Sequence, residues 1–462
     1  MDTQKMNRRA RARRRVSVTA VLGLFGAASH ADGLLYGVDA GVGETDNVTL
    51  VPSDKVSQTL AIADLDFSLK EQGRRLSEDV TGNFTYLDFL QHAFGSELLG
   101  RLNGVASFAL IPDRLVWTLQ DNWSQAQVNP FGPLVPTNRE NINYVSTGPN
   151  WYSRLGSTTF MNISGLYSRA DYQQTPIDND RLQGSAQLGH EISSQSSISV
   201  NGQIQRVFYQ NTTLNVDYDI DRVFLRYELH GARTDVSLDA GIDKEITGGQ
   251  SSSGFLAQLN ATRRVSPSVA LDLSLGRTLT DSSAGFNSLQ TSNATSSYNP
   301  TSPVNIATNA PVTITSGVYT GDFVLAGWRY VRARTSLSLT GRWEKDTYVY
   351  EPQFDGSRDR LDINIERRFN HALSIQLFGN LVATRYSHEL FAADATNYTD
   401  QDGLYGFALT LREGRGLEVR LRADHLSHDV SSGTGLGYRE NRILLTVGYR
   451  PTPASTYLDM GQ

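Results

Sequence analysis

The amino-acid sequence predicts an all-β protein, a single up-and-down antiparallel transmembrane β-barrel of about 20 strands, with 18 strands as the alternative. Three observations predict this fold: apolar and polar residues alternate along most of the 462 residues, the alternating runs are long, and the connections between them alternate in length. The composition agrees, because Gly (40), Tyr (20) and Phe (18) are prominent. A mean hydropathy of −0.34 excludes a helical membrane bundle. The lack of Cys (0) excludes disulfides and thiolate metal sites.

Residues 1–31 are predicted to be a secretory signal peptide. Seven basic residues lie among the first 15, an uncharged apolar run covers 16–28, and small residues occupy the cleavage positions of Ser29-His30-Ala31. A basic amphipathic surface helix is the alternative, since the run is too short to span a bilayer as a helix. We expect Sec export with cleavage after Ala31. The net charge of −6 then becomes −12, because seven basic residues and one acidic residue are lost. A chain with this much negative charge is predicted not to bind nucleic acid.

Residues 32–450 are predicted to form the barrel. In the run 417–424, apolar residues alternate with charged ones, so the run has one apolar face and one polar face when it is extended. The alternating runs last about 10–15 residues, which suits a tilted membrane-spanning strand and exceeds the usual soluble strand. The residues expected to face lipid include Leu273, Leu337, Ile363, Val419 and Leu421.

The connections predict how the strands are ordered. Nine short turns, such as the one at Ser266-Pro267, alternate with ten longer loops, which gives about 20 strands with both termini periplasmic. The longer loops are expected near 44–56, 89–96, 128–139, 173–178, 211–217, 247–252, 282–316, 351–357, 387–401 and 430–436. Loops 128–139, 282–316 and 387–401 are expected to be external. Pro451 and Pro453 end the last strand, so residues 451–462 are predicted to be a short periplasmic tail.

Aromatic residues gather near the ends of the predicted strands. They include Trp151-Tyr152, Phe208-Tyr209, Tyr348-Val349-Tyr350 and Tyr386. An amphipathic ring at a strand end favours a girdle at the level of the lipid headgroups. The alternative is a set of rings that stack on sugars.

One local motif resembles a known family. The first predicted strand ends in Thr45-Asp46-Asn47-Val48, Pro52-Ser53 follows, and Gly73-Arg74-Arg75-Leu76 comes after the paired strand. This pattern resembles outer-membrane β-barrel proteins of Gram-negative bacteria that are associated with PEP-CTERM/exosortase and exopolysaccharide systems. The resemblance covers about 50 residues. It implies an outer-membrane location and a link to polysaccharide export, with polysaccharide and periplasmic export components as partners besides outer-membrane lipid.

Charged residues recur on the polar face of the strands, which is expected to line the lumen. The candidate lumen-lining residues are Arg222, Arg226, Asp235, Asp239, Arg342, Glu344, Arg360, Asp362, Glu366, Arg420, Arg422, Asp424 and Arg442. Neighbouring strands offer opposite signs, with Arg222 and Arg226 beside Asp235 and Asp239, and with Arg342 and Glu344 beside Arg360 and Asp362. One interpretation is a structural ladder of ion pairs that fixes strand register. The other is a hydrated pore wall that selects solutes.

No catalytic or metal motif stands out. The eight His residues form no HExxH pair, and His425 and His428 are three residues apart, hence on opposite faces of a strand. No GxSxG motif or phosphate loop is evident. The sequence predicts no catalytic residue, no metal site, no cofactor and no enzymatic activity, with a barrel enzyme as the alternative.

Residues 282–317 contain no charged side chain and are rich in Ser, Thr, Asn and Pro. A loop this long without regular structure is often functional. It either stays external or folds inward and narrows the channel. Three functions remain open: a conduit connected with exopolysaccharide export, a general or substrate-specific porin for small-solute uptake, and a structural protein with a blocked lumen.

Overall fold

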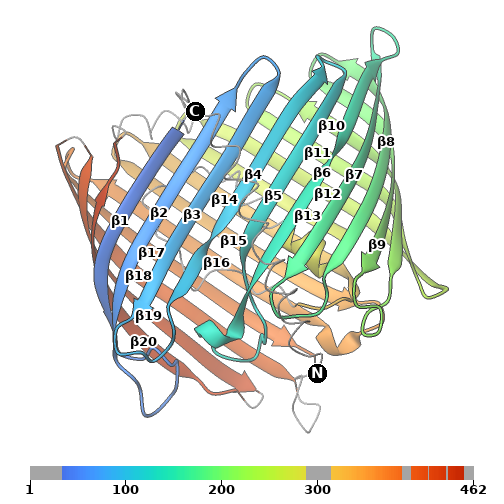
Figure 1. Cartoon of the computed structure of the whole chain (residues 1–462). Helices are drawn as coiled ribbons and strands as arrows, with labels where there is room; N and C mark the ends of the chain where they lie inside the picture. The colour runs from blue at the N-terminus through green and yellow to red at the C-terminus, as the bar shows by residue number, and fades with distance from the viewer. Residues whose placement is uncertain (1–33, 288–313, 388–396, 415, 433–434, 452–462) are drawn as a thin grey trace, which may run out of the picture.

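The chain forms one closed antiparallel barrel of 20 strands (Figure 1). The computed structural model describes residues 34–287, 314–387, 397–414, 416–432 and 435–451. Each strand pairs with its neighbours along the chain, and β1 closes the barrel by pairing with β20. The predicted fold class and strand number are confirmed.

The strands share a length of 12 to 17 residues, which is far above the mean for soluble sheets. They are β1 (Leu34–Thr45), β2 (Gln58–Gln72), β3 (Leu76–Phe89), β4 (Glu97–Ile111), β5 (Leu115–Gln127), β6 (Arg139–Arg154), β7 (Thr159–Tyr172), β8 (Asn179–Ser193), β9 (Ser196–Tyr209), β10 (Tyr218–His230), β11 (Thr234–Thr247), β12 (Gln250–Ser266), β13 (Val269–Asp281), β14 (Val318–Arg332), β15 (Thr335–Tyr348), β16 (Gly356–Arg368), β17 (Leu373–Tyr386), β18 (Tyr398–Glu413), β19 (Leu417–Ser432) and β20 (Tyr438–Tyr449). Two short 3-10 helices, η2 (Pro136–Asn138) and η3 (Pro352–Phe354), lie in loops.

The two rims of the barrel differ in the length of their connections. The turns that follow the even-numbered strands have two to four residues and form one rim, which we call the short-turn rim. Nearly all the connections at the opposite rim, the long-loop rim, are longer. Leu34 and Tyr449 lie at the short-turn rim, because β1 and β20 are antiparallel and pair Val38 with Tyr449.

One predicted long loop is wrong. The connection between β11 and β12 was expected over 247–252, but it consists of Gly248 and Gly249 alone. Their φ angles of 56° and 85° belong to the left-handed region, which glycine enters without a steric penalty. Two such residues close a tight hairpin turn of the type I′ kind, so no longer loop is needed.

The outward face of the barrel is apolar over most of its height. Leu273, Ile363 and Leu421 are exposed on this face, where lipid contact was expected, and Val419 and Leu337 share it with partial exposure. Their neighbours along the chain point inward, as the two-residue period of a strand requires. Among the described residues, no helix is both long and apolar enough to span a membrane.

The outward face becomes charged towards the long-loop rim of β7 to β10. Arg169 pairs with Asp171 at 2.8 Å, and Arg206 lies 3.7 Å from Asp219. Such charges are costly in hydrocarbon and stable at a wet interface. They therefore mark the limit of the apolar band on this side.

The seam between the first and last strands is held by one buried cation. The guanidinium of Arg450 lies 2.7 Å from Asp39, 2.9 Å from Asp66 and 3.2 Å from Glu418. It lies over the backbone of β1 at Gly37, where an added Cβ would come within 2.4 Å of the Asp66 carboxylate and 2.8 Å of Arg450. The absence of a side chain at position 37 therefore makes room for this network.

The motif that carries the family resemblance fastens the loop after β1 to β20. Asn441 donates hydrogen bonds to the Asp46 carboxylate at 2.8 and 2.6 Å. Burial raises the pKa of that carboxyl, but the hydrogen bonds from Asn441 outweigh burial and hold the pKa below its ordinary value. The Asn47 amide donates to the carbonyl oxygens of Val51 at 2.7 Å and Arg439 at 2.9 Å. The motif thus has a structural role at the seam.

Candidate functional site in the lumen

The end of the β13–β14 hairpin leaves the barrel wall and enters the lumen. Pairing between β12 and β13 stops where Ala257 faces Arg277, whereas β13 and β14 stay paired up to Asp281. The backbone N–H of Leu279 then donates to the Asp243 carboxylate at 2.7 Å, and Leu279 is buried although Arg277 is exposed. The strand therefore crosses from the outer to the inner side of the wall between these two residues.

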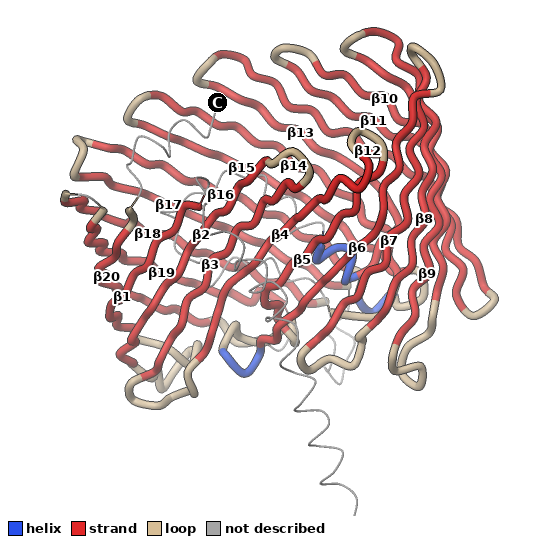
Figure 2. The backbone as a smooth tube through the Cα atoms, turned by 45° about the horizontal axis from the view of Figure 1, so that its top comes forward, coloured by secondary structure: helices blue, strands red, loops and turns tan. Residues whose placement is uncertain are grey.

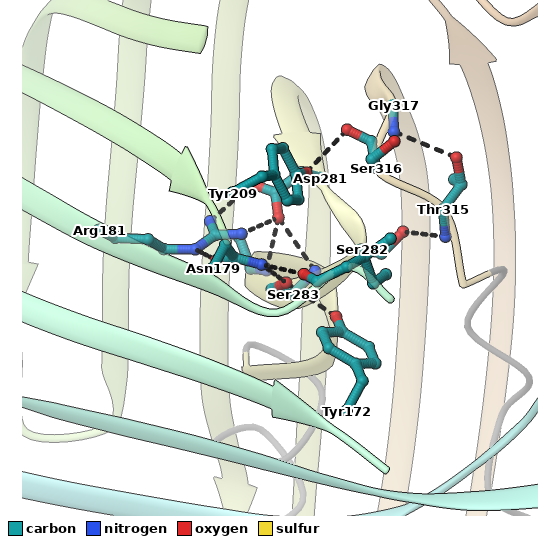
Figure 3. A network of polar contacts seen from close by, with 12 residues as sticks. Tyr172, Asn179, Arg181, Tyr209, Asp281, Ser282, Ser283, Thr315, Ser316 and Gly317 are labelled. Atoms are coloured by element: carbon teal, nitrogen blue, oxygen red, sulfur yellow. Dashed lines mark hydrogen bonds and ion pairs between the residues drawn. The ribbon is translucent and has the colours of Figure 1, made fainter. Parts of the chain in front are cut away.

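A buried ion pair holds this hairpin against the inner face of β8 (Figure 3). Arg181 on β8 donates two hydrogen bonds to Asp281, at 2.8 and 2.6 Å, and the side chains are only 1% and 2% exposed. Asn179 accepts a third hydrogen bond from Arg181 at 2.7 Å. The Asp281 carboxylate also accepts the N–H groups of Ser283 and Ala284 at 3.0 and 3.1 Å. Because both charges are so fully hydrogen-bonded, their removal from water is compensated.

Residues 281–287 and 314–317, here called the inward segment, continue along this wall. Residues 282–287 are helical, and Figure 2 shows this helix inside the barrel. Ser283 Oγ lies 2.8 Å from the hydroxyl of Tyr172, and the hydroxyl of Tyr209 donates to the carbonyl oxygen of Ser316 at 2.9 Å.

The inward segment reaches β5 at its last described helical residue. The carboxamide oxygen of Asn287 accepts hydrogen bonds from Asn122 and, at 3.2 Å, from Gln120. The segment thus runs from β13 past β8 and β7 to β5, and its contacts are mostly uncharged amides and hydroxyls. Residues 288–313 of the predicted uncharged loop lie outside the described residues. The described ends of that loop fold into the lumen, as one of the two alternatives for this loop predicted.

A belt of buried tyrosines supports the segment. The belt faces inward at the long-loop rim and consists of Tyr144, Tyr172, Tyr209, Tyr218, Tyr319, Tyr348, Tyr386, Tyr398 and Tyr438. The girdle interpretation is therefore wrong for Tyr209, Tyr348 and Tyr386, because their strand positions have inward parity and loop residues cover their rings. It fits Trp151 and Phe208, which are exposed on the outward face.

A second loop crosses the mouth of the barrel. Residues 128–138 leave β5, yet the ring of Phe131 packs edge-on against Tyr386 and Tyr398, with centroid distances of 4.9 and 4.8 Å. Val135 of the same loop packs on a cluster that includes Tyr438. This loop, expected to be external, thus spans from β5 to β17–β20 at the long-loop rim.

All thirteen candidate lumen residues have inward positions on β10, β11, β15, β16, β19 and β20. Arg226 pairs across strands with Asp239 at 2.7 Å, as expected. The other expected neighbours differ. Arg222 is opposite Asp243 and donates to the carbonyl oxygen of Leu279, whereas Asp235 is opposite His230.

The second expected group, on β15 and β16, also pairs differently. The register places Arg342 opposite Arg360, so each finds its carboxylate two residues along its own strand, at 2.7 Å in Glu344 and in Asp362. Glu344 is bridged across strands by Arg358, at 2.5 Å. The expected pairs differ from the observed ones because the pairing register of β15 with β16 cannot be read from the alternation of residue types alone.

The remaining candidates form a third group on β16, β19 and β20. Asp424 accepts from Arg422 at 2.8 Å and from Arg442 at 2.5 Å, so one carboxylate joins two strands. Glu366 lies 3.3 Å from Arg368. Arg420 lies 3.5 Å from Glu418, beside the Arg450 network.

Three important residues were missed by the sequence analysis: Arg181, Asp281 and Arg450. Inward parity on β8 was a signal for Arg181, the one Lys or Arg of that strand, because an inward charge needs a partner. Nothing in the sequence pairs it with Asp281, because the two lie 100 residues apart and meet only when β13 bends inward.

Comparison with solved structures finds barrels of low similarity. They include the siderophore receptor PirA from Acinetobacter baumannii, with 8% identity and a TM-score of 0.47 over 90% of this chain and 80% of that chain. The FrpB iron transporter (F3-3 variant) from Neisseria meningitidis has 8% identity and a TM-score of 0.42 over 92% and 82%. OccK2 (OpdF) from Pseudomonas aeruginosa, in complex with glucuronate, has 10% identity and a TM-score of 0.36 over 91% and 98%. No protein-family model and no curated protein sequence matches this chain.

Proposed function

We propose that this chain is an outer-membrane channel for small, hydrophilic, uncharged solutes, with saccharides as the best-fitting class. The observation that carries the proposal is the inward segment, which the buried Arg181–Asp281 pair holds inside the barrel. A segment held in this way narrows the path through the lumen. A narrowed path favours small solutes over a wide polymer conduit.

The side chains of the uncharged loop and those of the wall of β15, β16, β19 and β20 both favour the passage of uncharged solutes. Residues 282–317 carry no charge and offer hydroxyl and amide groups, which suit sugar hydroxyls. On β15, β16, β19 and β20, arginines pair with carboxylates, as Arg422 and Arg442 do with Asp424. Paired charges produce a weaker field than a ring of one sign, so they present little attraction to ions of either sign.

A link to exopolysaccharide export is the finer part of the proposal. It is supported by the family resemblance around Thr45-Asp46-Asn47, a motif that fastens the loop after β1 to β20. A channel that passes saccharides is compatible with a place in such a system.

Reconstitution of the purified full-length protein tests the channel. We expect single-channel conductance in planar bilayers, and swelling of proteoliposomes in mono- and disaccharides. Swelling should fall steeply with saccharide size and should be slower in a sugar acid of equal size. A silent bilayer together with absent swelling would show a blocked lumen and favour a structural protein.

A separate measurement addresses export. Secreted polysaccharide is compared between cells with and without the gene, and in cells that carry the Arg181→Ala variant. Loss of secretion on deletion supports the export link. Unchanged secretion, combined with normal saccharide swelling in vitro, would keep the channel and remove the export link.

A further inference from the structure

We propose that Asp400, Asp402 and His428 form a binding site for a divalent transition-metal cation on the lumen wall near the long-loop rim. Each of the three offers one ligand atom, and these atoms lie within 4.8 Å of one another. Asp402 on β18 is directly opposite His428 on β19. Asp400 lies two residues before Asp402, hence on the same inward face of the strand.

A buried carboxylate oxygen without a partner points to a ligand. The side chains of Thr384 and Tyr398 lie close to the Asp400 carboxylate, but its Oδ1 has no hydrogen-bond partner among the described residues, and the whole residue is only 4% exposed. Burying an unsatisfied carboxylate oxygen is costly. No Lys or Arg among the described residues forms an ion pair with Asp400 or Asp402. A bound cation supplies a partner for this oxygen and adds positive charge beside two carboxylates whose nearby cationic group is the imidazole of His428.

The simpler interpretation is a plain hydrogen bond between Asp402 and His428. Nδ1 of His428 does lie 2.8 Å from Oδ1 of Asp402. That pair explains two of the residues, but it leaves Oδ1 of Asp400 unpaired. Ligand atoms about 2.0–2.1 Å from a tetrahedral ion lie about 3.3 Å apart, so a bound cation would replace this hydrogen bond and would hold the imidazole in its neutral form.

The donor set selects the class of cation. Ca²⁺ and Mg²⁺ prefer ligands that are all oxygen, whereas an imidazole nitrogen with carboxylates suits Zn²⁺ and other first-row transition ions. Three protein ligands leave further positions for water. The Asp402 side chain is 39% exposed, which gives the cation a route from the lumen to two otherwise buried ligands.

The site lies beside the anchor of the loop that crosses the mouth. The ring of His428 stacks on Tyr438 with a centroid distance of 4.9 Å, and Tyr398, two residues before Asp400, contacts Phe131 of that loop. A cation here would join β18 to β19 directly beneath these rings.

Calorimetric titration of the metal-free, full-length barrel in detergent tests the site, with Zn²⁺, Mn²⁺ and Ca²⁺ as probes. We expect one saturable Zn²⁺ site that is stronger than any Ca²⁺ binding. His428→Gln and Asp400→Asn should each weaken Zn²⁺ binding at least tenfold. His425→Gln is the matched control, because His425 lies on the outward face of the same strand and pairs with Asn441 at 2.7 Å. Its Zn²⁺ affinity should equal that of the unaltered protein.

Several outcomes would overturn the proposal. They are an absence of saturable Zn²⁺ binding, equal affinities in the His428→Gln and His425→Gln variants, and a preference for Ca²⁺ over Zn²⁺. Heat-modifiable mobility on gels shows whether each variant is a folded barrel. If His428→Gln does not fold, Asp402→Asn takes its place, since Asp402 is partly exposed and its amide keeps the same shape; unchanged Zn²⁺ affinity in that variant would also contradict the site.

Discussion

The two halves of the lumen wall carry different kinds of side chains at their inward positions. On β5 to β10, inward residues such as Ile142, Tyr172 and Ile220 are buried in one apolar cluster that includes Leu279 and Phe286 of the β13 end and the inward segment. On β15, β16, β19 and β20, inward positions carry arginines and carboxylates that pair with one another.

This difference shows what a covering segment requires of a wall. Where a segment lies on the wall, tyrosines contribute apolar rings and hydroxyl partners at once, and the one buried ion pair is fully hydrogen-bonded. On β15, β16, β19 and β20 the inward charges are also largely buried, and most of the carboxylates are compensated by neighbouring arginines, as Asp424 is by Arg422 and Arg442. Inward polarity alone therefore does not distinguish pore wall from packing surface.

Deletion of the inward segment and of the chain between its two ends should have the largest effect on the conductance of the barrel. Replacing residues 283–315 by a short Gly-Ser linker removes the material that covers β5 to β8, while the strand ladders close without it. Single-channel conductance should rise clearly, and heat-modifiable mobility should still report a folded barrel. Unchanged conductance with intact folding would mean that the segment does not narrow the path.

Breaking the buried ion pair should release the same segment without deleting it. Arg181→Ala leaves Asp281 buried and uncompensated, a change that costs about 3–5 kcal/mol. Conductance should therefore rise towards that of the deletion variant. Arg226→Ala is the matched control, because Arg226 is 33% exposed and its hydrogen bonds go to Asp239 on the neighbouring strand. Equal conductance changes in both variants would contradict the anchoring role of Arg181.

The sequence predicted the wall of the barrel better than its contents. Two-residue alternation identified the inward and outward positions of β16 and β19 correctly, because each residue's facing follows from local chain geometry. The inward turn of β13 after Arg277 depends on a partner 100 residues away in sequence, at Arg181, so no local pattern reveals it. The Tyr386 ring was misplaced for the same reason, since its covering partner Phe131 comes from another loop.

Facing is tested by placing one charge on either side of the wall. Leu421→Arg puts a guanidinium on the apolar outward face, where it should cost about 2–4 kcal/mol near mid-membrane. Asn364→Arg puts it on the inward face of β16, where polar neighbours already lie, and should cost far less. Urea unfolding in lipid vesicles measures both. Equal losses, or a larger loss for Asn364→Arg, would contradict the assigned faces.

The smallest change in the free energy of unfolding is expected at an exposed ion pair between neighbouring strands. Lys70 and Asp79 lie 3.3 Å apart near the short-turn rim, and both side chains are 56% exposed. Lys70→Ala should change the free energy of unfolding by less than about 1 kcal/mol, because water solvates the remaining carboxylate. Arg358→Ala removes a partner of Glu344 where both side chains are mostly buried, so it should cost more. Urea unfolding at low and high salt compares them, since screening weakens exposed pairs first. A larger loss of stability for Lys70→Ala than for Arg358→Ala would mean that burial does not determine how much these ion pairs contribute to stability.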